Sequence, residues 1–166
     1  IGEQQDILDN PESTDEAKAA ATEEIAKLKN KIFKPIIGCE CYCARRKHTD
    51  HDNTFRIEEA GKSIIADSSG WHLILIAKNK HGYQNLCKIV SKAWVDGYYN
   101  RPRIDKDLLV QYHEDLIVCS ACLGGELPKK IMSDDLEGAE ATAKWFKDLF
   151  GDDYYIEIQR HKTDKP

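Results

Sequence analysis

Apolar runs and amphipathic stretches alternate along most of this chain, and the pattern predicts strands that alternate with helices. Four apolar runs have the length and composition of strands, at residues 34–39, 71–79, 116–122 and 154–161. Apolar periodicity and capping residues predict helices at residues 11–33, 81–94, 104–109 and 137–150. Because such alternation favours a parallel sheet with right-handed crossovers, the expected fold class is α/β.

The first predicted helix differs from the others because its N-terminal half is polar on all sides. Ser13, followed three residues later by a glutamate, forms a capping box and is the expected N-cap residue. Apolar residues such as Ile25 share one face only in the C-terminal half of this helix. We therefore expect residues 1–33 to be a helical insertion or linker segment and residues 34–166 to form a separate domain.

Glu40 follows the first predicted strand, which starts at Pro35 and contains two isoleucines that indicate burial on both faces. A carboxylate at the end of a buried strand is costly unless it is paired or binds a metal. In barrels of alternating strands and helices, the C-terminal strand ends carry the chemistry. Glu40 is therefore a candidate functional residue, and an exposed loop glutamate is the alternative.

The histidines are ambiguous when judged from the residues alone. His72 lies near the start of the second predicted strand, where alternation places it on one face with Ile74 and Ile76. A satisfied core histidine is the favoured interpretation there, and a metal ligand is the alternative. Residues 45–52 contain two histidines and two aspartates, but no apolar segment there would fix ligand geometry, so a mobile loop is favoured over a metal cluster.

Two further pairs of polar residues are candidates for binding. Arg101 and Arg103 lie beside aromatic residues in a predicted loop at residues 97–103, which fits a nucleic-acid contact through phosphates or stacked bases. A loop anchored by its tyrosines is the favoured alternative. In the last predicted strand, Glu157 and Gln159 share a polar face, which fits either a polar barrel interior or a sheet edge.

Composition narrows the function classes. The chain has 166 residues and a net charge of −5, which argues against an autonomous nucleic-acid binder because such proteins usually show a basic patch. No apolar run of about 18 residues predicts a membrane span, and no leader marks secretion, so a cytoplasmic location is expected. The chain starts at Ile1 in polar sequence and ends just past a strand-like run, so we expect a fragment excised from a longer protein.

The six cysteines are expected to be reduced thiols, as in cytosolic proteins. Cys119 and Cys122 form a CxxC spacing, but the second cysteine pair of a zinc ribbon is missing. A redox-active CxxC normally opens a helix, whereas this one lies in strand-like sequence. Structural zinc and redox chemistry are therefore both disfavoured for this pair.

Six motifs stand in order along the chain: KPIIGCE from Lys34, WHLILIAKN from Trp71, GYQNL from Gly82, YYNRPRID from Tyr98, SACLGGE from Ser120 and YIEIQRH from Tyr155. Together they resemble the polymerase and histidinol phosphatase (PHP) domain, in the form found in bacterial DNA polymerase III alpha subunits. The resemblance implies a fragment of a distorted (βα)7 PHP barrel, with an inserted charged helix at its N-terminal end.

In that family a cluster of metals lies at the strand ends. Carried over by motif, the resemblance implies that Glu40, His72 and Cys122 are ligands of a divalent metal, either zinc, manganese or magnesium. It also implies that Glu157 and Gln159 line the same cavity behind the ligands. Three cysteines alternate with Glu40 and are expected to pack against the outer helices: Cys39, Cys41 and Cys43.

The chain also departs from the family pattern. The opening His-x-His and Thr-Asp-His-Gly motifs are absent before Lys34, and the closing Asp-x-His motif would lie beyond Pro166. Thr49-Asp50-His51-Asp52 imitates the second of these motifs but follows Glu40, so it is interpreted as a decoy. With three of the expected ligands at most, this chain should bind metal weakly or not at all.

The resemblance implies one function for the longer parent protein and another for its PHP domain. The parent protein would be a DNA-directed DNA polymerase that performs nucleotidyl transfer on DNA and deoxynucleotides with magnesium. Its PHP domain would be a metal-dependent phosphoesterase, for instance a 3′–5′ proofreading exonuclease, while the isolated fragment would be inactive. The alternative is a non-catalytic platform that docks the proofreading exonuclease and other polymerase III holoenzyme subunits, and a free-standing PHP phosphatase ranks last. Unpaired edge strands in such a fragment would invite self-association.

Overall fold

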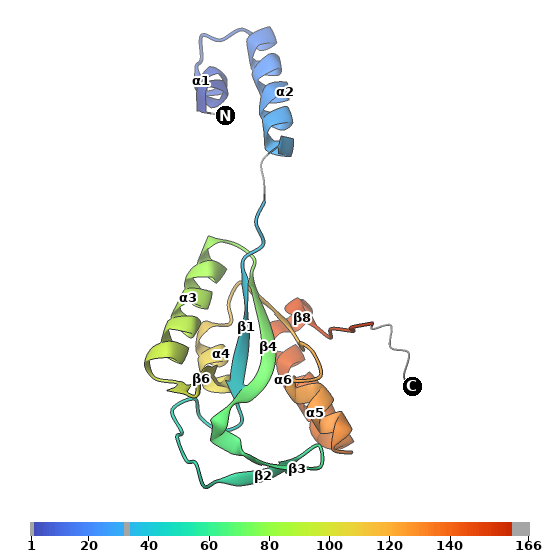
Figure 1. Ribbon diagram of the computed structural model, residues 1–166. Coiled ribbons are helices and arrows are strands. Elements are labelled where there is room, and N and C mark those ends of the chain that lie inside the picture. The colour runs from blue at the N-terminus through green and yellow to red at the C-terminus, as the bar shows by residue number, and fades with distance from the viewer. Residues whose placement is uncertain (1, 32–33, 161–166) are drawn as a thin grey trace. The chain divides into compact units, whose positions relative to one another are not determined.

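The computed structural model describes residues 2–31 and 34–160, and these fall into two compact units (Figure 1). The first unit is Ile1–Pro35 and the second is Ile36–Pro166. All the candidate site residues belong to the second unit, so its sheet is the part of the structure that matters for function. Among the described residues, no helix combines the length and the apolar character needed to cross a membrane.

The first unit is a pair of helices, α1 (Gly2–Asp9) and α2 (Asp15–Lys31), that pack against each other. The sequence pattern predicts α2 but not α1, which has no buried residue. The hydroxyl of Thr14 accepts a hydrogen bond of 3.2 Å from the Ala17 main chain, so Thr14 caps α2 and the prediction of Ser13 is wrong. The predicted last turn at residues 32–33 lies outside the described residues.

The second unit is built on a six-stranded sheet with the order β5-β6-β1-β4-β7-β8. The strands are β1 (Gly38–Ala44), β4 (Gly70–Ala77), β5 (Tyr98–Tyr99), β6 (Arg101–Ile104), β7 (Leu116–Cys119) and β8 (Tyr154–Tyr155). The β4 strand runs antiparallel to both β1 and β7, whereas β6 is parallel to β1 and β8 is parallel to β7. The sheet is therefore mixed, and the prediction of a parallel sheet is wrong.

The antiparallel β1–β4 pair follows from what connects these two strands. The connection contains a second, two-stranded sheet, β2 (Arg56–Glu59) with β3 (Lys62–Ile65), and the 3₁₀ turn η1 (Ala66–Ser68), but no α-helix. A parallel pair needs a crossover, which is usually a helix, whereas a chain that returns without one pairs antiparallel. The sequence pattern did not reveal β2 and β3 because both strands are short and half polar.

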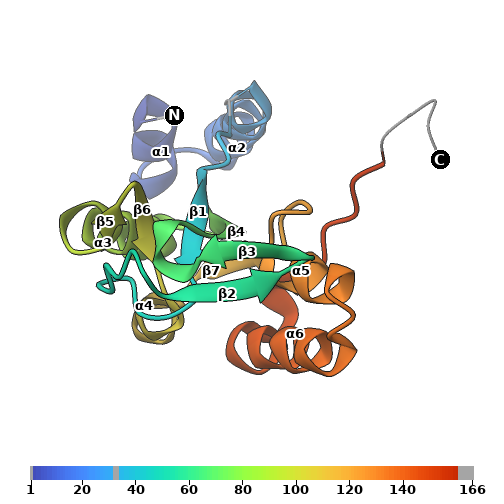
Figure 2. The ribbon, with the colours of Figure 1, turned by 60° about the horizontal axis from the view of Figure 1, so that its bottom comes forward.

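Helices cover one face of the six-stranded sheet. They are α3 (Lys80–Val95), α4 (Lys106–Tyr112) and α6 (Leu136–Phe150). The short helix α5 (Glu126–Met132) packs against α6, which is followed by the 3₁₀ turn η2 (Gly151–Asp153). In Figures 1 and 2, α3 and α4 lie to the left of the central strands β1 and β4, and α5 and α6 lie to the right. On α3, Leu86, Ile89 and Ala93 are buried against the sheet, and Val90 is partly buried there. Side chains from β1, β4 and β7 on this face join the helices in one core.

Three predicted strand boundaries are wrong. The first strand begins at Gly38, and Ile36 is 84% exposed, so the isoleucine pair precedes β1 and Glu40 lies within the strand. The third strand ends at Cys119, because Ala121 adopts a left-handed φ of 60° that an extended strand does not allow. The β8 strand contains only Tyr154–Tyr155, and His161 lies outside the described residues.

The segment at residues 97–103 is also not the predicted loop. It contains β5 and β6, which pair antiparallel around Asn100, a residue with a left-handed φ of 60°. The helix that follows, α4, begins at Lys106 because the Asp105 carboxylate accepts a hydrogen bond of 2.9 Å from the Leu108 main chain and caps it.

Candidate metal centre

The two faces of β1 have different environments. Cys41 and Cys43 point to the helix-covered face and are buried in the core, which confirms their predicted packing role. Glu40 and Tyr42 point to the opposite face, which the helices leave uncovered. Tyr42 is paired with His72 of β4 across the antiparallel ladder, so the side chains of both residues lie on this open face.

The open face brings the three predicted ligands together. His72 Nδ1 lies 2.7 Å from Glu40 Oε1 and 3.4 Å from Cys122 Sγ. One ligand atom from each of the three residues lies within 4.8 Å of the other two, and no other such group is found among the described residues. An oxygen, a nitrogen and a sulfur donor from three separate segments therefore converge at one place.

The loop after β7 places Cys122 against His72. The His72 main-chain N–H donates a hydrogen bond of 3.0 Å to the Gly124 carbonyl, which joins this loop to β4. The Gly125 N–H closes the turn on the Cys122 carbonyl at 2.9 Å, and the Gly124 N–H lies 3.3 Å from Cys122 Sγ. A Cβ at Gly124 would lie 3.0 Å from the His72 ring, so the close approach needs glycine there.

These distances fit the coordination of zinc. Ligand atoms at bond lengths of about 2.0–2.3 Å around a tetrahedral zinc ion lie about 3.5 Å apart, and the Cys122–His72 separation of 3.4 Å already matches. The Glu40–His72 contact of 2.7 Å is shorter, but the Glu40 side chain is exposed and free to rotate. A thiolate and an imidazole favour zinc over magnesium or calcium, which prefer oxygen ligands.

Tyr42 and Arg101 extend the site along the same face. The rings of Tyr42 and His72 meet edge to face with centroids 5.1 Å apart. The Arg101 guanidinium lies over the Tyr42 ring at 4.9 Å and donates a hydrogen bond of 3.0 Å to its hydroxyl. Arg101 remains exposed, and its predicted contact with a phosphate stays a prediction. Sequence reasoning missed Tyr42, although its alternation with Glu40 was a usable signal.

Arg103 does not have the accessible position that was predicted for it. Its side chain is fully buried and donates hydrogen bonds of 2.7–3.1 Å to four carbonyl oxygens, those of His48, Asp50, Asp67 and Gly97. Burial lowers the pKa of the guanidinium, although the neighbouring aspartates oppose that shift. The prediction of a nucleic-acid contact is therefore wrong for Arg103, because its side chain is buried and four of its five N–H donors bond carbonyl oxygens of the surrounding loops.

The histidine-rich loop is a structural element rather than a ligand cluster. The His48 main-chain N–H donates to Asp105 at 2.9 Å, and the His48 ring nitrogen Nδ1 contacts the same carboxylate. Burial alone would raise the pKa of Asp105, but the hydrogen bonds from His48 and Leu108 outweigh it, so this pKa is lowered. Asp52 accepts hydrogen bonds from Thr54 within the loop. These carboxylates are therefore engaged with the chain itself.

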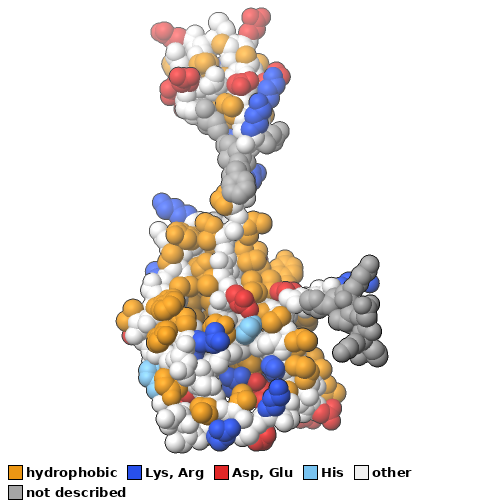
Figure 3. Space-filling model, in the orientation of Figure 1, with side chains coloured by type: hydrophobic (Ala, Val, Ile, Leu, Met, Phe, Trp, Pro, Cys, Tyr) orange, Lys and Arg blue, Asp and Glu red, His pale blue; other side chains and the backbone are white. Residues whose placement is uncertain are grey.

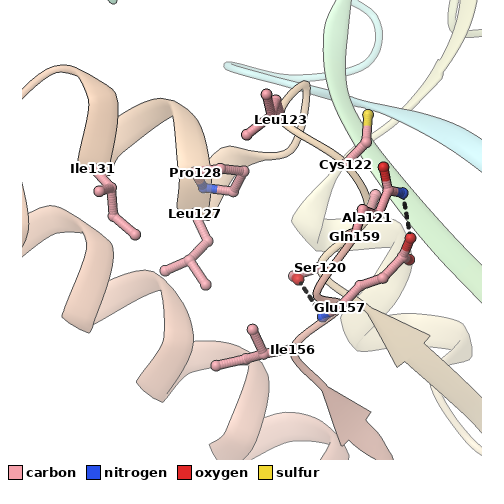
Figure 4. Close-up of a pocket in the computed structure, with 10 residues that line it drawn as sticks. All are labelled: Ser120, Ala121, Cys122, Leu123, Leu127, Pro128, Ile131, Ile156, Glu157 and Gln159. Carbon is pink, nitrogen blue, oxygen red and sulfur yellow. Dashed lines mark hydrogen bonds between the residues drawn. The ribbon is translucent and has the colours of Figure 1, made fainter. Parts of the chain in front are cut away.

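Glu157 and Gln159 lie near Cys122, as the resemblance implied, but on an irregular segment rather than a strand. Figure 4 shows both side chains beside Cys122 in a pocket of about 250 Å³, where the Gln159 amide donates to the Glu157 carboxylate. The Glu157 main-chain N–H donates to the Ser120 hydroxyl at 2.9 Å, which holds this segment against the loop that carries Cys122. Their role around a metal stays a prediction.

Comparison with known proteins identifies the family to which this chain belongs. The family model described as "PHP domain" matches residues 7–161, so the chain belongs to the PHP domain family.

Relatives named DNA polymerase III subunit alpha match most of the chain. The protein from Borreliella burgdorferi is 44% identical over 129 residues, which are 78% of this chain and 10% of the relative. The protein from Deinococcus radiodurans is 41% identical over 128 residues, or 77% of this chain and 9% of the relative. The protein from Chlamydia pneumoniae is 43% identical over 132 residues, which are 80% of this chain and 10% of the relative. The chain thus spans about a tenth of the length of these relatives.

Proposed function

We propose that this chain is part of the PHP domain of a bacterial replicative DNA polymerase alpha subunit and contributes Glu40, His72 and Cys122 to a metal-dependent phosphoesterase site. The observation that carries the proposal is the convergence of these three ligand atoms within 4.8 Å on an uncovered sheet face. The names of the relatives give the longer protein to which the domain would belong. Residues 34–166 would be the partial domain and residues 1–33 the insertion.

Each residue of the site has a distinct role in this proposal. The Glu40 carboxylate and the Cys122 thiolate supply negative charge that holds a divalent cation, and His72 contributes Nδ1 between them. Glu40, His72 and Cys122 would hold the metal, which would supply Lewis-acid chemistry for phosphoester hydrolysis. Arg101 binds a nonbridging oxygen of the phosphoester, with its guanidinium oriented by the Tyr42 ring.

The ligand set favours zinc, and manganese or magnesium are the alternatives to be measured. Magnesium would serve the separate nucleotidyl-transfer site of the parent polymerase, which acts on DNA and deoxynucleotides in the cytoplasm. Helices cover one face of the sheet and leave the site on the other, which supports a place for that open face in the interior of a complete (βα)7 PHP barrel. Missing ligands would then come from the rest of the longer chain.

A platform without catalysis is the second candidate, and an exposed apolar surface favours it. Trp94 and Tyr98 are both exposed and their rings stack with centroids 5.6 Å apart, while the adjacent Val95 is 80% exposed. Figure 3 shows hydrophobic side chains gathered over β1 and α3 on the face in view. Such patches are typical of protein interfaces, and the partner would be the proofreading exonuclease subunit. A free-standing PHP phosphatase ranks third.

Hydrolysis of a phosphodiester by the longer protein separates the first two candidates. The substrate is single-stranded DNA with a labelled 3′ end, assayed with zinc or manganese and with the polymerase palm carboxylates removed. The phosphoesterase proposal predicts hydrolysis that falls at least tenfold in Cys122→Ala and is retained in Cys87→Ala, an exposed cysteine on α3. Hydrolysis that is absent in the parent protein, or equal in all variants, would reject the proposal and favour the platform.

A further inference from the structure

Glu126 is a buried carboxylate beside the loop that carries Cys122, and none of the roles above uses it. It is the first residue of α5 and is only 6% exposed. Its Oε1 atom accepts hydrogen bonds from Lys106 at 3.0 Å, Lys130 at 2.9 Å and Thr142 at 3.0 Å. Lys106 Nζ also lies 3.0 Å from Oε2 as an ion pair. A buried charge is tolerated when it is paired and hydrogen-bonded in this way.

The partners of Glu126 come from three different helices. Lys106 belongs to α4, Lys130 to α5 and Thr142 to α6. Lys130 also donates to the Thr142 hydroxyl at 2.7 Å, which closes the cluster into a connected network. The Lys106 ammonium lies 5.0 Å from the centroid of the Trp145 ring on α6. The start of α5 is therefore held at one place relative to α4 and α6.

The position of the start of α5 determines where the loop that carries Cys122 lies. Glu126 follows Gly125, whose N–H bonds the Cys122 carbonyl at 2.9 Å and which forms a β-bridge with His72. Gly125 packs closely against the loop, because a Cβ at this position would lie only 2.2 Å from the Ser120 carbonyl oxygen. Only three residues separate Cys122 from Glu126, so a shift at the start of α5 is transmitted to the thiol.

We propose that Glu126 is a positioning residue for the metal site: its network with Lys106, Lys130 and Thr142 holds the Cys122 thiol against His72. The inference rests on the proposed metal site for its consequence, but the orientation of the thiol is testable without metal. Glu126 touches neither metal nor substrate. Outer partners that orient ligands typically change metal affinity by about 10–100-fold when they are removed.

The first test measures metal binding with cobalt(II) as a spectroscopic probe for zinc. Glu126→Gln keeps the size of the side chain but removes the charge that pairs with the two lysines. The proposal predicts an affinity for cobalt about tenfold weaker and a reduced thiolate-to-cobalt charge-transfer band. Glu140→Gln, an exposed position on α6, is the matched control and should leave both unchanged.

A double-mutant cycle separates positioning from a general effect on the fold. If Glu126 acts through Cys122, Glu126→Gln should change cobalt affinity by less than about twofold in a Cys122→Ala background. If the unsubstituted chain binds cobalt, an equal loss of affinity in both backgrounds, or no loss in either, would overturn the proposal. Circular dichroism checks folding, and Thr142→Val provides a milder second variant in case Glu126→Gln does not fold.

The second test needs no metal and keeps the inference separate from the proposed function. Alkylation of each cysteine is followed by mass spectrometry in the metal-free chain. The proposal predicts several-fold faster alkylation of Cys122 in Glu126→Gln and Thr142→Val, while Cys87, exposed on α3, reacts at an unchanged rate. Unchanged Cys122 rates in both variants would overturn the inference. Faster rates in a chain that binds no cobalt would support it and reject the metal proposal alone.

Discussion

His72 is the residue on which the site is centred. Its imidazole contacts Glu40 and Cys122, its main chain bonds Gly124, and its ring meets Tyr42 edge to face. The motifs in the sequence singled out Glu40, His72 and Cys122 as candidate ligands, but only through a family resemblance. Local pattern favoured a core histidine, because strand periodicity places a side chain on a face without telling which face the helices leave uncovered.

The first prediction for a single residue concerns Gly124. An added Cβ would lie 3.0–3.1 Å from three atoms of the His72 ring, so Gly124→Ala should displace that ring from its ligand position. We expect cobalt affinity to fall by about tenfold and the free energy of unfolding to fall by about 1 kcal/mol. Gly2→Ala, where a Cβ meets no atom within 4 Å, is the control, and equal cobalt titrations for both variants would contradict the expectation.

The second prediction concerns pH and Asp105. Because the pKa of this carboxyl is lowered in the folded state, its contribution to stability is present above the unfolded-state pKa of about 3.9 and is lost as pH falls through the lower folded value. Asp105→Asn should reduce the free energy of unfolding by about 2 kcal/mol at neutral pH. The difference from the parent should shrink steadily as pH is lowered from about 5 toward 2.

Urea denaturation at several pH values measures this difference. Asp107→Asn, an exposed carboxyl in the first turn of the same helix, is the control and should change stability by less than about 0.5 kcal/mol at every pH. A stability difference for Asp105→Asn that stays constant down to acid pH would show that its charge is not the source.

At the scale of helices and strands, the sequence was most informative where a periodic apolar pattern extends over many residues. The α3 and α6 helices and the β4 strand were predicted within a few residues, because each buries a regular set of apolar side chains. The short elements failed: β5 and β6 look like a loop, and β2 and β3 carry little apolar pattern. Their pairing depends on distant contacts, such as those of Arg103, that local sequence does not contain.

Arg103 gives the prediction at this scale, because it joins β6 to three surrounding segments. Its guanidinium donates to four carbonyl oxygens from inside the protein, and lysine has neither the reach nor the planar fork to replace it. Arg103→Lys should therefore lower the free energy of unfolding by about 3 kcal/mol in thermal or urea denaturation. Arg101→Lys, at the exposed position two residues earlier, should cost less than about 0.5 kcal/mol, and similar costs for both would contradict this account.

At the scale of the whole molecule, the second unit has a covered face and an open one. Its edge strands, β5 and β8, contain two residues each, so they offer little backbone for pairing. Exposed apolar side chains such as those of Trp94 and Val95 remain as a route to association. The sequence predicted self-association from cut edges, whereas the short edge strands and the exposed apolar side chains favour the apolar surface as its physical basis.

We expect light scattering to show association that increases with concentration and that weakens in Val95→Lys, because a buried ammonium is costly. Gln84→Lys, which adds the same charge at an exposed polar position of α3, should leave the association unchanged. A chain that stays monomeric at every concentration would contradict this prediction.

The measurement that tests the central claim most directly is zinc binding by the unsubstituted chain of 166 residues and by three variants: Glu40→Gln, His72→Ala and Cys122→Ala. The account predicts weak but measurable binding of about one zinc ion per chain, with affinity reduced by about tenfold or more in each variant and unchanged in Cys87→Ala. If the unsubstituted chain binds no zinc, or if all three variants bind zinc equally well, the claim that these residues form a metal centre is contradicted.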